Sequence, residues 1–66
     1  MGQFPGRAVY HVYAMPWKGG YELHVPNLGI TQSKSRDDAE GMVVDLIVQR
    51  TGAAADSFAV DIAYVE

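Results

Sequence analysis

The sequence predicts an α+β fold with the element order β-β-β-α-β, in which one helix covers one face of a small, antiparallel-dominated sheet. Apolar and polar residues alternate with period two over Arg7–Met15, Tyr21–Val25 and Ser57–Val65, and this alternation is typical of strands. Between Ser35 and Gly52 the apolar residues instead follow the spacing of a helix. The chain has only 66 residues, so these elements form one small domain.

Three strands are predicted in the first half of the chain. Arg7–Met15 is rich in Val and Tyr, and it is followed by the turn Pro16–Gly20, whose two adjacent glycines supply the positive φ of a tight hairpin. Tyr21–Val25 forms the second strand and Leu28–Ser33 a short third strand, with a break at Pro26-Asn27 between them. We therefore expect a three-stranded meander before the helix.

The length of the hairpin loop decides which side of the first strand is buried. An even loop places one alternating set of both strands under the helix, and an odd loop inverts the first strand relative to the second. With an even loop, the helix-covered set is Ala8, Tyr10, Val12, Ala14, Tyr21, Leu23 and Val25.

The helix has the clearest signals in the sequence. Ser35 is a typical N-cap residue, and Asp38, three positions later, approximates a capping box. The apolar positions match the i, i+3, i+4, i+7, i+8 pattern: Ala39, Met42, Val43, Leu46 and Ile47. Gly52 is a natural terminator, and the final strand follows as Ser57–Val65.

Composition limits the classes of function. The net charge of −3 disfavours nucleic acid as the main ligand, and the absence of cysteine excludes disulfides and thiolate metal sites. No apolar run is long enough to cross a bilayer, and the first residues do not resemble a secretory signal, so we expect a cytoplasmic protein. We interpret residues 1–6 as a flexible N-terminal arm and residues 7–66 as the single domain.

No catalytic constellation is visible in the sequence. His11 and His24 could serve a metal or acid–base role with Glu22, but two half-exposed strand histidines are the preferred interpretation. The carboxylates are scattered or gathered at the helix start, whereas a two-metal nuclease site needs several that converge. We therefore predict no catalytic residue, no metal and no cofactor.

An interface is predicted instead on the face of the sheet that the helix leaves open. This face would hold an unusual number of large apolar and aromatic side chains, which usually mark interfaces. Its predicted residues are Val9, His11, Tyr13, Met15, Trp17, Glu22 and His24. Sheet curvature, or the arm with Phe4, could instead cover them. On the helix, Val44 and Val48 form a separate ridge, either a second contact or the margin of a wide core stripe.

Three short motifs, in order, resemble the HicB-like antitoxins, a bacterial toxin–antitoxin family. Gly20–Leu28 is similar to the family's Gly-Tyr strand and its Val-Pro-(Asp/Asn)-Leu bend, and Gly29–Ser33 is similar to the strand after it. Ser35–Glu40 resembles the opening of the family's helix. The resemblance implies a partly degraded ribonuclease H-like fold, assembly into dimers or tetramers, and neutralisation of a small HicA-type toxin that cleaves messenger RNA. The family's DNA-binding extension does not follow Glu66, so we expect no direct nucleic acid binding.

Three functional hypotheses follow. The first is a non-enzymatic protein-binding module, an antitoxin-like protein whose acidic charge suits a small basic toxin. The second is an orphan homo-oligomeric domain that has a regulatory or scaffolding role and no toxin. The third, a small ribonuclease-like enzyme, is disfavoured because the carboxylates do not cluster in the sequence.

Overall fold

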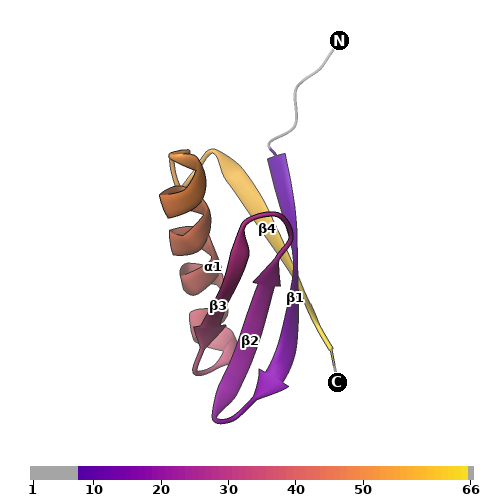
Figure 1. The fold of residues 1–66 in the computed structure, drawn as a ribbon. Helices are drawn as coiled ribbons and strands as arrows, with labels where there is room; N and C mark the ends of the chain where they lie inside the picture. Colours follow the sequence, from indigo (N-terminus) through magenta and orange to yellow (C-terminus); the bar gives the residue numbers. More distant parts are fainter. Residues whose placement is uncertain (1–7, 66) are drawn as a thin grey trace.

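A computed structural model describes residues 8–65, and it confirms the predicted fold class. One four-stranded mixed sheet carries a single helix on one of its faces (Figure 1). The elements are β1 (Ala8–Trp17), β2 (Gly20–Val25), β3 (Gly29–Ser33), α1 (Arg36–Thr51) and β4 (Phe58–Tyr64). The predicted arm, residues 1–6, and the predicted first strand residue, Arg7, lie outside the described residues.

The strands lie side by side in the order β3-β2-β1-β4. β1 pairs antiparallel with β2 and parallel with β4, and β2 pairs antiparallel with β3. β1 is the longest strand and lies inside the sheet, so it contributes more residues to the two faces than any other strand. The edges of the sheet are β3 and β4.

The hairpin between β1 and β2 is tighter than the sequence predicts. Trp17 pairs directly with Gly20, so the loop consists only of Lys18 and Gly19, and Pro16 belongs to β1 rather than to the turn. A two-residue loop is even, and the conditional assignment of the helix-covered face is therefore confirmed. Gly19 has the positive φ (71°) that such a turn requires, whereas Gly20 is not among the positive-φ residues.

Two other strand boundaries move by one residue because turns hold the chain before the strands begin. The backbone N–H of Leu28 donates to the carbonyl of Val25 at 3.0 Å, which keeps Leu28 in the turn before β3. Likewise, the N–H of Ser57 donates to the carbonyl of Ala54 at 2.9 Å, and β4 starts at the next residue.

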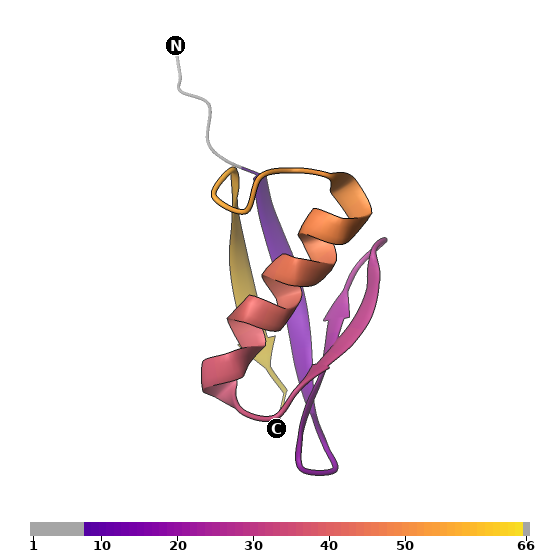
Figure 2. The same cartoon turned by 90° about the vertical axis from the view of Figure 1, so that its left-hand side faces the viewer.

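The helix begins and ends where its capping residues predict. The Ser35 hydroxyl accepts a hydrogen bond from the backbone N–H of Asp38 at 3.3 Å. At the other end, Gly52 adopts a left-handed conformation (φ 75°) and its N–H donates to the carbonyl of Val48. Figure 2 shows the helix lying diagonally across the sheet, with β4 and β1 behind it.

The N-cap leads to a stability prediction. We expect Ser35→Ala to lower the free energy of unfolding by about 1 kcal/mol, because the N–H of Asp38 loses its side-chain acceptor. Urea denaturation followed by circular dichroism measures this loss. Ser35→Asp keeps an acceptor at the cap and should leave stability nearly unchanged, so an equal loss in both variants would contradict the capping role.

The core lies between the helix and the inner face of the sheet. Its buried side chains are Val12, Ala14, Leu23, Val25, Ala39, Val43, Leu46, Ile47 and Phe58. Four of the five predicted helix positions are buried, and the fifth, Met42, is half-buried against the same cluster. The helix covers the inner face, whereas no helix of the described chain covers the opposite face. None of the helices described is long and apolar enough to cross a membrane.

Candidate functional site

The face of the sheet opposite the helix, hereafter the outer face, carries the large apolar side chains that the core does not contain. These side chains alternate with the buried positions along each strand. All six exposed large hydrophobic residues found in residues 8–65 are on this face or at its border: Val9, Tyr13, Met15, Trp17, Ile30 and Val65. A solvated sheet face normally alternates to polar residues, so this composition is typical of a contact surface.

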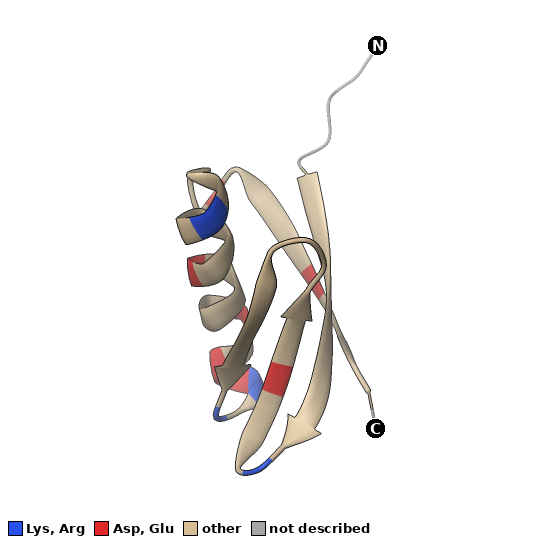
Figure 3. Cartoon of the chain, in the orientation of Figure 1, with Lys and Arg blue, Asp and Glu red and all other residues tan. Residues whose placement is uncertain are grey.

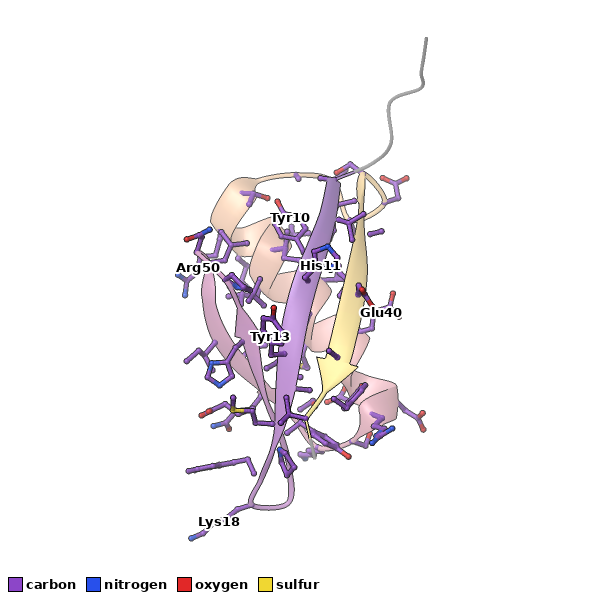
Figure 4. The ribbon with its side chains drawn as sticks, turned by 90° about the vertical axis from the view of Figure 1, so that its right-hand side faces the viewer. Tyr10, His11, Tyr13, Lys18, Glu40 and Arg50 are labelled. Atoms are coloured by element: carbon purple, nitrogen blue, oxygen red, sulfur yellow. The ribbon has the colours of Figure 1, made fainter. Side chains whose placement is uncertain are left out.

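The structure places all seven strand residues predicted for the interface on the outer face. Tyr13 lies near its centre and His11 further along the same strand, and both point away from the helix (Figure 4). Trp17, at the end of β1, is 54% exposed and Tyr13 is 48% exposed. Curvature of the sheet therefore does not bury these rings within the described chain.

Strand pairing extends the apolar surface across the sheet to a residue that the sequence analysis missed. Tyr13 lies opposite His24, and His24 lies opposite Ile30 on β3. Ile30 is 55% exposed. A short third strand was predicted around Ile30, but the face that Ile30 occupies could be assigned only once the register of β3 against β2 was known.

Two histidine–carboxylate pairs lie among the apolar residues. His24 Nε2 lies 2.9 Å from Glu22 Oε1, and His11 Nδ1 lies 3.3 Å from Asp61 Oδ2 on β4. Asp61 was not among the predicted residues, because nothing local in the sequence places β4 beside β1. Within residues 8–65, no three His, Asp or Glu side chains gather as they would around a metal ion.

The strands contribute only negative formal charges to the outer face, from the carboxylates of Glu22 and Asp61. None of the four strands contains Lys or Arg, and the basic residues in the described part of the chain lie in the hairpin turn, near the helix ends and before the helix (Figure 3). The outer face is thus apolar with acidic groups, which suits a partner that is basic around an apolar contact.

At its hairpin end, the outer face continues into an open hollow of about 640 Å³ along the free edge of β3. Trp17, Ile30 and Gln32 line it from the sheet, and Lys18 and Lys34 line it from the neighbouring loops. Asp38 lines it from the helix, so the hollow adds a border of mixed charge to one end of the outer face.

The two predicted helix positions do not belong to this surface. Val44 and Val48 are half-buried and pack against the core cluster. They lie on the opposite side of the sheet from Tyr13, so the structure separates them from the other seven residues. Their packing favours the interpretation in which they form the margin of a wide core stripe.

Comparison with known proteins found no match: no family model, no curated protein and no solved structure is significantly similar to this chain.

Proposed function

We propose that this chain is a non-enzymatic protein-binding module that contacts its partner through the outer face. The observation that carries the proposal is that, within residues 8–65, all six exposed large hydrophobic residues lie on or beside one sheet face, while the helix closes the other. Contiguous apolar and aromatic patches of this kind are characteristic of protein interfaces.

The proposed partner is a small basic toxin of the HicA type that cleaves messenger RNA, and the chain acts as its antitoxin in the cytoplasm. Two features support this partner. The motif Gly20–Leu28 resembles HicB-like antitoxins, and it forms β2 and the following bend, beside β1. The chain also has a net charge of −3, and Glu22 and Asp61 lie on the outer face, so complementary potentials would steer a basic toxin towards it.

A second candidate is a homo-oligomeric domain with a regulatory or scaffolding role and no toxin. It is favoured by the size of the domain, since the described chain has a small core of nine buried apolar residues and leaves the apolar outer face exposed. A toxin reading frame of about 60 to 90 codons beside the gene would favour the antitoxin over this alternative, since a small toxin domain has that size.

The antitoxin proposal is tested by co-expression with the neighbouring toxin in bacteria. We expect the chain to relieve the growth arrest that the toxin causes, and Tyr13→Lys to abolish the relief, because a lysine cannot be buried unpaired in an apolar contact. The fold should survive, because the side chain points away from the core.

Gln49→Lys, on the exposed side of the helix, is the matched control and should relieve growth arrest like the unchanged chain. Circular dichroism of both variants confirms that each is folded. Growth relief by a folded Tyr13→Lys variant would show that the outer face does not bind the toxin.

A further inference from the structure

We infer that a second copy of this chain covers the outer face, with the two sheets packed face to face about a two-fold axis and their β1 strands antiparallel. The axis passes at the level of the Ala14–Leu23 pair, the second of the five pairs in the β1–β2 ladder. The proposed function assigns the same face to the toxin, so the dimer is the form of the chain without toxin, and a bound toxin would displace the second copy.

The size of the apolar patch is the first argument. Its six large residues are each about half exposed. Aromatic residues such as Tyr13 and Trp17 bury about 150–250 Å² when covered, and the four aliphatic ones bury less, so the exposed area is roughly 500 Å² in total. An interface of standard size buries about 800 Å² per partner. The patch therefore supplies more than half of what a stable dimer needs, and the surrounding polar residues and strand backbone are available for the rest.

Charge selects the direction of the second copy. Lys18 lies at the hairpin tip, whereas His11, which contacts Asp61, lies towards the opposite end of β1 (Figure 4). Antiparallel packing brings each Lys18 towards the end of the other copy that holds Asp61. Parallel packing would instead bring the two Lys18 side chains together, and like charges in an interface are unfavourable.

Side-chain pairing selects the register. On one side of the Ala14–Leu23 pair lie Tyr13 and His24, and on the other side lie Met15 and Glu22. A two-fold axis at that level stacks Tyr13 on Met15 of the second copy and Glu22 on its His24, and symmetry makes each contact twice. A shift of the axis to Met15 would stack the two Glu22 carboxylates on each other. Sheets packed in this way lie about 10 Å apart, the spacing that interdigitating side chains fill.

The register is tested by charged pairs in sedimentation experiments. The unchanged chain should sediment as a dimer at tens of micromolar, and Tyr13→Lys or Met15→Glu alone should weaken association at least about 30-fold. An equal mixture of these two variants should restore a heterodimer, because the register places the new lysine opposite the new glutamate. A mixture of Tyr13→Lys with Tyr13→Glu is the matched control and should stay monomeric, because both substituted positions face Met15.

Three results would overturn the inference, provided that circular dichroism shows folded variants. If the unchanged chain were monomeric at several hundred micromolar, a second copy would not be what covers the outer face. A dimer that tolerates Tyr13→Lys would place the contact elsewhere, for example on the β3 edge. Equal recovery in the control mixture would refute the register. These experiments contain no toxin, so their failure and the failure of growth relief are separate outcomes.

Discussion

Leu46→Ala is expected to lower the free energy of unfolding by about 2–5 kcal/mol, because truncation removes buried methyl groups and leaves a cavity under the helix. Leu46 is only 8% exposed and belongs to the core cluster with Val43 and Ile47. In a domain of this size, a single core rarely supplies more than about 3–5 kcal/mol in total. We therefore expect the variant to be largely unfolded in the absence of a stabilising partner, as measured by urea denaturation and thermal melting.

Gln49→Ala is the matched control, since Gln49 lies on the same helix and is exposed. It should change the free energy of unfolding by less than about 0.5 kcal/mol. A loss below about 1 kcal/mol for Leu46→Ala would be inconsistent with its burial.

The helix could be predicted almost completely from the sequence because its determinants are local. The cap at Ser35, the apolar spacing through Leu46 and the terminator Gly52 all lie within one turn of the positions they control. The alternation along β1 is also a local pattern. Once the hairpin loop is known to be even, this pattern gives the residues of β1 that face the helix and those that face away from it.

The parts of the site that the sequence analysis missed depend on contacts between distant segments. Ile30 joins the outer face because β3 pairs with β2, and Asp61 joins it because β4 returns beside β1 in the parallel direction. The predicted meander placed β3 beside β2 but did not give the register of the pair, and the return of β4 beside β1 has no local signature. The role of Gly20 was misinterpreted for the same reason, because its constraint comes from the end of β3 and not from the turn.

That constraint leads to a prediction with a large effect, since a side chain at Gly20 would overlap the backbone of another strand. A Cβ built there would collide with the carbonyl oxygen of Ser33 and would lie 3.0 Å from the Cα of Lys34. Backbone atoms cannot rotate away as a flexible side chain can, so the β2–β3 ladder must shift. We expect Gly20→Ala to lower the free energy of unfolding by about 3 kcal/mol or more, the upper range for overpacking. Urea denaturation measures the loss.

Gly41→Ala provides the opposite case within the same chain and separates a specific clash from a general intolerance of glycine replacement. Gly41 is exposed in the middle of α1, and a Cβ there would meet no atom within 4 Å. Since alanine is the better helix former, the free energy of unfolding should rise by about 0.5–1 kcal/mol. The two substitutions should therefore have opposite signs. If Gly20→Ala were as stable as the unchanged chain, the close approach of Ser33 to β2 would be wrong, and with it the position of the hollow beside Trp17.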